Sequence, residues 1–166
     1  TSAGGRQARR HVRGEADEIN DAVFAELNYH AAYEPQRCVR TRRFKYIRRY
    51  GDRLLPTLPN VGPCPSRDVL MEGDWHEHPL AREELYDVRL DPGEYNNLAG
   101  REEFAEALDR MRARLDGWMA HTDDPLLEHG GVPPRPGVRT ADLNATTNHP
   151  TMMWECVPAS PPKEDL

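Results

Sequence analysis

Residues 102–122 have the sequence EEFAEALDRMRARLDGWMAHT, the most strongly periodic stretch of the chain. Its large apolar side chains recur at spacings of 4, 3, 4 and 3, one face of an α-helix: Phe104, Leu108, Met111, Leu115 and Trp118. Glu102 and Glu103 fall in the first turn, where the helix dipole favours carboxylates. We expect Asp123–Pro125 to end the helix. The pattern predicts one long amphipathic helix that covers an apolar surface elsewhere in the chain.

Upstream of this helix, three segments have the alternation and the β-branched and aromatic content typical of strands. They are Asp21–His30, Cys38–Tyr50 and Glu84–Leu90. We interpret Cys38–Tyr50 as one long strand that ends at a turn. Residues 57–65 predict a loop, and Ser66 is expected to cap a short helix that runs to Met71. The predicted fold is α+β, a small antiparallel sheet packed by the long helix.

Composition divides the chain into three parts. Residues 1–14 are basic and lack apolar periodicity, so we expect a mobile arm. Residues 129–166 contain seven Pro and few periodic apolar residues, which predicts an extended or disordered tail because little surface is available to offset the entropy of ordering. Residues 15–128 then form one compact unit with a single modest core.

Overall composition excludes several classes of protein. The 166 residues include 22 Lys+Arg and 28 Asp+Glu, a net charge of −6, which argues against a globally basic nucleic-acid-binding protein. The chain contains no run of 18 apolar residues, so no membrane-spanning helix is predicted. Residue 1 is Thr and no secretory signal pattern follows it, so we expect a processed or truncated product. Cys38, Cys64 and Cys156 are too few for a disulfide framework or a zinc site.

Two constellations of polar residues could bind ligands. Seven positive charges lie within residues 37–49, interleaved with aromatic side chains. This predicts either a surface for an anionic ligand or an ordinary solvated strand face, and alternation fits both. His76 and His78 lie two residues apart beside carboxylates, as in some metal sites. No third His lies nearby, so a loop pair without metal is the simpler interpretation.

One short motif nearly matches the nucleophile signature of the sulfatases. That signature, C-x-P-S-R, carries the Cys that is oxidised to formylglycine, whereas residues 64–67 are Cys-Pro-Ser-Arg. The intervening residue is missing, so Cys and Pro are adjacent and the register fails. We therefore do not expect Cys64 to be a nucleophile.

Other motifs carry a fuller resemblance to the same family. Residues 37–47, R-x-V-R-T-x-R-F-K-Y-I, resemble a strand common in the C-terminal region of bacterial sulfatases. ELYD at 84–87, DPGE at 91–94 and NLA at 97–99 resemble the turn that follows it, and T-x-D-P at 122–125 resembles the end of the next helix. Residues 23–26, with His30 and Pro35, are similar to the N-sulfoglucosamine sulfohydrolase subgroup.

This resemblance covers residues 12–128 and implies the C-terminal subdomain of a sulfatase-type hydrolase of sulfuric esters or sulfamates, with an antiparallel sheet of about four strands and a packed helix. It implies that formylglycine and Ca²⁺ belong to a larger N-terminal catalytic domain of the same polypeptide. The substrate would be a sulfated sugar, including N-sulfoglucosamine, and the compartment exported, periplasmic or lysosomal. This chain alone, without nucleophile, metal site or cofactor, would be inactive. The alternative is a stand-alone polyanion-binding or interaction module that has lost catalysis.

Within the subdomain, residues 26–37 are the candidate wall of a substrate pocket, because they enter the first strand pair through a polar and aromatic loop. His30 could hydrogen-bond a sugar hydroxyl or sulfate, or be an ordinary loop histidine. Arg37 could bind a sulfate or carboxylate through its guanidinium fork, or form a salt bridge with a neighbour. Tyr29 and Glu34 complete the predicted substrate-binding set, and no catalytic residue or metal ligand is predicted.

Overall fold

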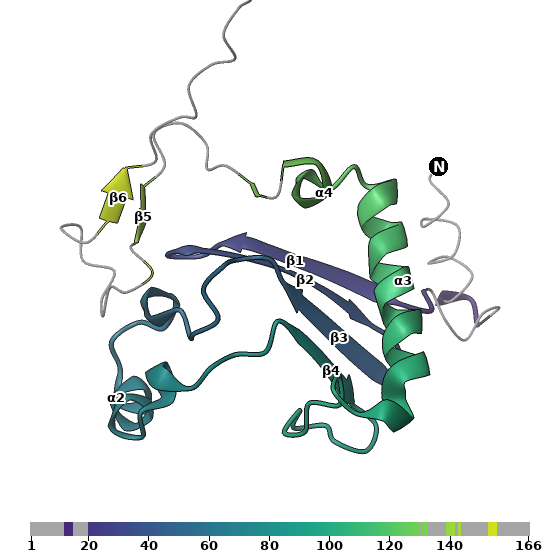
Figure 1. Cartoon of the computed structure of the whole chain (residues 1–166), viewed down its shortest axis with the longest axis horizontal. Helices are drawn as coiled ribbons and strands as arrows, with labels where there is room; N and C mark the ends of the chain where they lie inside the picture. The colour runs from purple at the N-terminus through teal and green to yellow at the C-terminus, as the bar shows by residue number, and fades with distance from the viewer. Residues whose placement is uncertain are drawn as a thin grey trace, which may run out of the picture.

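The computed structural model describes residues 12–14, 20–129, 131–132, 139–141, 143 and 153–155. Its strands are β1 (Val23–Tyr29), β2 (Tyr33–Arg40), β3 (Phe44–Arg49), β4 (Glu83–Asp87), β5 (Arg139–Ala141) and β6 (Met153–Glu155). Its helices are α2 (Pro65–Glu72), α3 (Ala105–His121) and α4 (Pro125–His129), with 3₁₀ turns η1 (Leu58–Asn60), η2 (Trp75–Glu77) and η3 (Glu102–Phe104). Strands β1 to β4 form an antiparallel sheet in chain order, and α3 lies across one of its faces (Figure 1). The predicted α+β fold is confirmed.

The register of the sheet places one apolar row beneath the helix. Phe24, Val39, Tyr46 and Leu85 are direct partners across the four strands. Since side chains alternate between faces, the row two residues further along lies on the same face, and it is charged throughout: Glu26, Arg37, Arg48 and Glu83. The covered face therefore has an apolar half and an ionic half.

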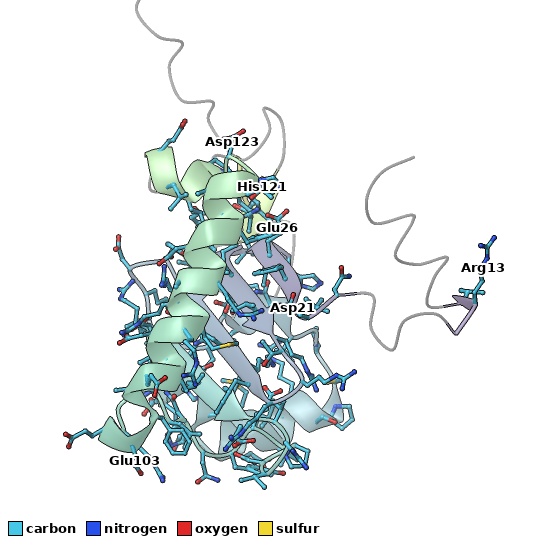
Figure 2. The ribbon with its side chains drawn as sticks, turned by 90° about the vertical axis from the view of Figure 1, so that its right-hand side faces the viewer. Arg13, Asp21, Glu26, Glu103, His121 and Asp123 are labelled. Atoms are coloured by element: carbon cyan, nitrogen blue, oxygen red, sulfur yellow. The ribbon has the colours of Figure 1, made fainter. Side chains whose placement is uncertain are left out.

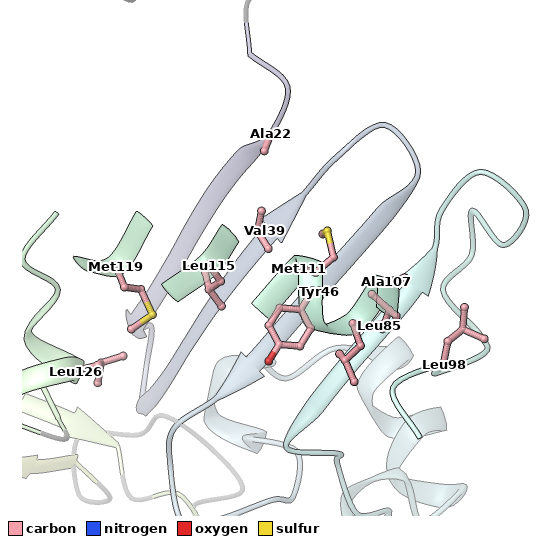
Figure 3. Close-up of a cluster of buried hydrophobic side chains, with 11 residues drawn as sticks. Ala22, Val39, Tyr46, Leu85, Leu98, Ala107, Met111, Leu115, Met119 and Leu126 are labelled. Carbon is pink, nitrogen blue, oxygen red and sulfur yellow. The ribbon is translucent and has the colours of Figure 1, made fainter. Parts of the chain in front are cut away.

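Helix α3 supplies the other side of the core. Leu108, Met111 and Leu115 are buried as its periodicity predicts, and they meet the apolar row of the sheet (Figure 3). Trp118 stacks on Phe24 with ring centroids 5.1 Å apart. Full burial of one such side chain contributes about 1.5–3 kcal/mol, so the helix and the sheet stabilise one another.

The prediction of one long strand over Cys38–Tyr50 is wrong. The segment belongs to two strands, β2 and β3, that turn at residues 41–43. The turn contains no Gly, Pro or Asn, and Thr41 closes it instead. Its hydroxyl oxygen accepts a hydrogen bond from the Phe44 amide at 3.0 Å, and its own amide donates to the Phe44 carbonyl at 2.8 Å. A hydroxyl thus replaces the usual turn residues.

Two other predicted boundaries shift for local reasons. Helix α2 begins at Pro65 with Cys64 as its N-cap, rather than after Ser66, because proline is favoured at the first helical position. Strand β4 ends at Asp87, before the predicted Leu90. The Asp87 carboxylate accepts hydrogen bonds from the amides of Arg89 and Leu90, both at 3.3 Å, which bends the chain away from the sheet.

The outer edge of β4 is covered by the NLA segment. Asn97 Oδ1 accepts a hydrogen bond from the Leu85 amide at 3.0 Å, and its Nδ2 donates to the Glu83 carbonyl at 3.0 Å. The Leu98 amide donates to the Leu85 carbonyl at 2.8 Å. One side chain and one amide thus stand in for a fifth strand, which satisfies an edge that could otherwise pair with another chain.

The predictions for the two ends of the chain fall mostly on residues that the structure does not describe. These are the mobile arm at 1–14 and the extended or disordered tail at 129–166. In the described part of that tail, β5 pairs with β6, and the Ala141 amide donates to the Ala31 carbonyl at 2.7 Å. Among the described residues, no helix has the length and apolar character needed to cross a membrane.

Candidate functional site

The predicted substrate-binding residues lie around the turn that joins β1 to β2. Residues Tyr29 and Tyr33 are partners at the end of the hairpin, after an irregularity in register that follows Leu27. Asn60, from η1, holds the turn: its Oδ1 accepts hydrogen bonds from the amides of Ala31 and Ala32 at 2.9 and 3.1 Å. The turn is therefore fixed by a residue from a distant loop.

Tyrosine hydroxyls attach a later segment of the chain to the same turn. Tyr29 donates a hydrogen bond to the Val132 carbonyl, and the Val132 amide donates to the Tyr33 hydroxyl at 3.0 Å. The two rings lie 4.9 Å apart, centroid to centroid. Both hydroxyls thus hold the backbone, and their rings form one aromatic surface beside the turn.

His30 lies at the tip of the turn and is exposed. Its amide donates to the Ala32 carbonyl at 3.2 Å, and its imidazole makes no hydrogen bond or ion pair with any residue that the structure describes. The ring can therefore donate to or accept from a ligand without giving up an internal partner. Among the four predicted residues, His30 is the one best placed to meet a ligand.

Glu34 faces a pocket of about 340 Å³ next to this turn. Its carboxylate accepts a hydrogen bond from Asn60 Nδ2 at 2.6 Å. Arg49 and Arg53 contribute positive charge to the lining, and Tyr33 and Tyr50 contribute aromatic surface. A pocket that combines aromatic surface with both signs of charge suits a sugar, which presents CH groups, hydroxyls and anionic substituents together.

Arg37 lies inside the domain, 1% exposed. Its Nε and Nη2 donate to the two carboxylate oxygens of Asp124 at 2.6 and 3.0 Å. Its Nη1 donates to the side chain of Asn28 at 2.9 Å and to the carbonyl of Gln36 at 3.0 Å. The guanidinium thus joins β2 to the start of α4, and its substrate role stays a prediction.

Asp124 is the residue that sequence analysis missed. We interpreted it as part of a helix stop, whereas its Oδ1 also accepts a hydrogen bond from the Leu126 amide at 3.0 Å and so caps α4. Burial alone would raise the pKa of this carboxyl, but its hydrogen bonds with Arg37 and with that amide hold it below the ordinary value. Arg37 of the R-x-V-R motif and Asp124 of the T-x-D-P motif thus form one buried ion pair.

The basic stretch at residues 37–49 does not form one surface. Lys45 pairs with Glu94 at 2.5 Å, Arg48 with Asp116 at 2.6 Å and Arg49 with Glu84 at 3.0 Å. Arg42 and Arg43 lie exposed at the β2–β3 turn, where Arg43 pairs with Asp87 at 2.8 Å. The charges therefore divide between both faces of the sheet and one turn, as strand alternation requires.

A metal site at His76 and His78 finds no support in the described residues. No group of three or more His, Cys, Asp or Glu side chains is arranged to hold a metal ion there or elsewhere in that part of the chain. The two histidines lie in and just after η2.

Comparison with models of protein families finds no match, but individual proteins do match. An ulvan-active sulfatase of Formosa agariphila is 32% identical over 53% of this chain and 17% of its own length. The human N-sulphoglucosamine sulphohydrolase is 28% identical over 68% of this chain and 26% of its own length. A solved 2-O GAG sulfatase is 25% identical over 72% of this chain and 20% of its own, with a TM-score of 0.48. The chain thus spans about a quarter or less of the sulfatases it matches.

Proposed function

We propose that this homologue of the sulfatases is the C-terminal part of a sulfatase-type hydrolase, which completes the fold beside a catalytic domain and forms one wall of its substrate pocket. The observation that carries the proposal is the small share of each relative that this chain covers. Sulfatase sequence extends over 53–68% of this chain, yet the matched part accounts for only 17–26% of these curated relatives. A large part of such an enzyme thus lies outside these 166 residues.

The chemistry of the whole enzyme would reside in that other part. Formylglycine and Ca²⁺ are the groups expected there, and they would supply the nucleophile and the charge stabilisation at sulfur. The residues that the structure describes do not fit either group. Residues 64–67 lack the spacing of the nucleophile motif, and no described cluster of carboxylates, histidines or cysteines suits a metal ion. No catalytic step is therefore assigned to this chain.

The uncovered face of the sheet is the proposed contact with the catalytic domain. Its central row begins with three apolar side chains that are exposed or half-buried, Ala25, Cys38 and Ile47, and ends at Glu84, a buried carboxylate that pairs with Arg49. Val23, at the end of the neighbouring row, is 63% exposed. Such a face favours packing against a second layer, and a domain of the same polypeptide would supply that layer.

The turn at residues 29–34 is the proposed wall of the substrate pocket. His30 presents an imidazole that no described residue engages, and Glu34 faces the adjacent pocket with Arg49 and Arg53. The relatives are named for ulvan and for N-sulphoglucosamine, so we take the substrate class as a sulfated sugar. Both O-sulfate and N-sulfate remain within that class.

A native cysteine of the chain can report on the proposed contact with the catalytic domain. Cys38 lies in the centre of the uncovered face, and Cys64 is exposed at the start of α2. In the longer protein encoded with the upstream reading frame, we expect iodoacetamide to label Cys38 at least tenfold more slowly than in this chain alone, because a packed thiol is inaccessible. Cys64 should be labelled at the same rate in both, with Cys156→Ser in each protein to simplify the readout.

Two outcomes would contradict the proposal. The first is an upstream reading frame without sulfatase sequence, and the second is equal labelling of Cys38 in the two proteins.

For the substrate wall, His30→Ala in the longer protein should raise KM for a sulfated sugar with little change in kcat, because a binding contact is lost. His78→Ala removes an exposed histidine elsewhere and provides the matched control.

A further inference from the structure

A second hollow lies at the opposite end of β2 from the proposed substrate wall. It has a volume of about 370 Å³ and is bounded by the β2–β3 turn and the side of α3. Four arginines surround it, Arg42 and Arg43 from the turn and Arg110 and Arg114 from the helix, and Asp21 also lines it. No local pattern in the sequence reveals this group of arginines, because it joins residues about 70 positions apart.

The two helix arginines are ion-paired, but their side chains stay accessible to an external ligand. Arg114 pairs with Asp21 at 2.7 Å, and Arg110 pairs with Glu106. Figure 2 shows Asp21 beside α3, between Glu103 and His121 at the two ends of the helix. The Arg114 side chain is 43% exposed and that of Arg110 is 59% exposed. Ion pairs in water contribute little, so an anion in the hollow could share these guanidinium groups at small cost.

The shape and chemistry of the hollow favour a sulfate or similar oxyanion attached to a ring. Guanidinium forks match the paired oxygens of such a group. Phe44 and Met111 add an apolar lining, and the Arg43 guanidinium lies over the Phe44 ring, 4.8 Å from its centroid. A sugar that carries a sulfate presents both an anion for the arginines and CH groups for the apolar side chains.

We propose that this hollow binds a sulfated segment of a glycan chain away from the residue being hydrolysed. The choice of a glycan rests on the proposed function, whereas the anion site rests on the geometry of the hollow and on the accessible guanidinium groups of Arg110 and Arg114. Because the hollow and the turn at residues 29–34 lie at opposite ends of β2, one extended polysaccharide could occupy both. The hollow would then hold the enzyme on a polymeric substrate.

The test is the binding of a heparin dodecasaccharide to the full chain by isothermal titration calorimetry at several salt concentrations. Each guanidinium contact with a polyanion releases close to one counterion, so the log–log salt slope should fall by about 2 in Arg110→Ala/Arg114→Ala. The affinity of this variant at low salt should fall at least tenfold. Arg89→Ala/Arg101→Ala makes the same change in net charge with exposed arginines outside the hollow and should bind as the parent does.

Three results would overturn the proposal: no binding of heparin at low salt, equal losses in both double variants, or equal affinity for a DNA duplex of similar charge. Sodium sulfate is titrated separately, and saturable heat from sulfate without heat from heparin would mean an adventitious ion only. Thermal unfolding of both variants verifies that they fold. Binding at the hollow does not depend on Cys38 labelling, so this proposal and the proposed function can fail separately.

Discussion

The two faces of the sheet both mix apolar and charged side chains, but they differ in what covers them. The face under α3 contains a full row of charges, Glu26, Arg37, Arg48 and Glu83. The central row of the uncovered face has the apolar Ala25, Cys38 and Ile47 and ends at the charged Glu84. Within the charged row of the covered face, only Arg37 is fully buried, and it is the residue that both carboxylate oxygens of Asp124 hold.

The covered charges are tolerated because α3 and α4 bring their counter-charges. Arg112 donates to Glu83, and the Tyr46 hydroxyl donates to the same carboxylate. Arg48 contacts Asp116. The uncovered face also carries charge pairs, Lys45 with Glu94 and Arg49 with Glu84, but no helix packs over it among the described elements. The covered face therefore has its second layer within this chain, and the proposed contact with a catalytic domain concerns the other face.

The largest expected effect follows from breaking the most deeply buried pair of the covered face. Arg37→Ala leaves the Asp124 carboxylate buried without its fork, and we expect the free energy of unfolding to fall by about 3–5 kcal/mol. Urea denaturation followed by tryptophan fluorescence measures it. Arg114→Ala breaks an exposed pair with Asp21 and should cost at most about 1 kcal/mol. Equal losses in the two variants would mean that burial does not set the strength of these pairs.

The next largest effect is the difference in stability loss between apolar substitutions on the two faces. Leu115→Ala opens a cavity beneath the helix and should cost about 2–5 kcal/mol. Ile47→Ala removes a half-buried side chain from the uncovered face and should cost less than about 1.5 kcal/mol in this chain. In the longer protein, the cost of Ile47→Ala should rise toward that of Leu115→Ala. An unchanged cost there would argue against packing on the uncovered face.

The edge of the sheet offers a smaller effect with a second readout. Asn97→Ala removes the acceptor for the Leu85 amide and the donor for the Glu83 carbonyl. We expect a loss of about 1–3 kcal/mol, together with faster aggregation, because the β4 edge becomes free to pair with another chain. Light scattering during incubation measures the second effect. Asn96→Ala, next to it and exposed, is the matched control and should aggregate as the parent does.

The sequence predicted those parts of the fold whose pattern is local. The apolar face of α3 can be recognised because its contacts all lie on one side of one helix. The β2–β3 turn was missed because Thr41 closes it with a hydroxyl, which is a less specific signal than Gly or Asn. The uncovered face was equally invisible, since alternation gives two faces without saying which one a helix will cover.

The structure gives the surroundings of the predicted site residues, and their role with substrate stays a prediction. A polar and aromatic loop pointed to residues 26–37, and Tyr29, His30 and Glu34 lie at the turn that joins β1 to β2. The partner of Arg37 lies 87 residues away, and so no local pattern could show that its guanidinium is engaged. Asn60 lies in a loop distant in sequence from the turn it holds, and no spacing rule connects the two.

The last prediction concerns pH and tests whether the covered charges act as a network. Hydrogen bonds from Arg112 lower the pKa of Glu83 to about 2, from an ordinary value of 4.5, against the opposing effect of burial. A carboxyl with a depressed pKa stabilises the fold fully above its unfolded pKa and loses that contribution as pH falls through the folded one. The parent should therefore lose stability between about pH 4.5 and pH 2, and Glu83→Gln should show a shallower loss over the same range in thermal unfolding. Glu106→Gln, whose side chain is 88% exposed, should follow the parent's pH profile. Identical pH profiles for the parent and Glu83→Gln would mean that the ionic half of the covered face contributes nothing through this carboxylate.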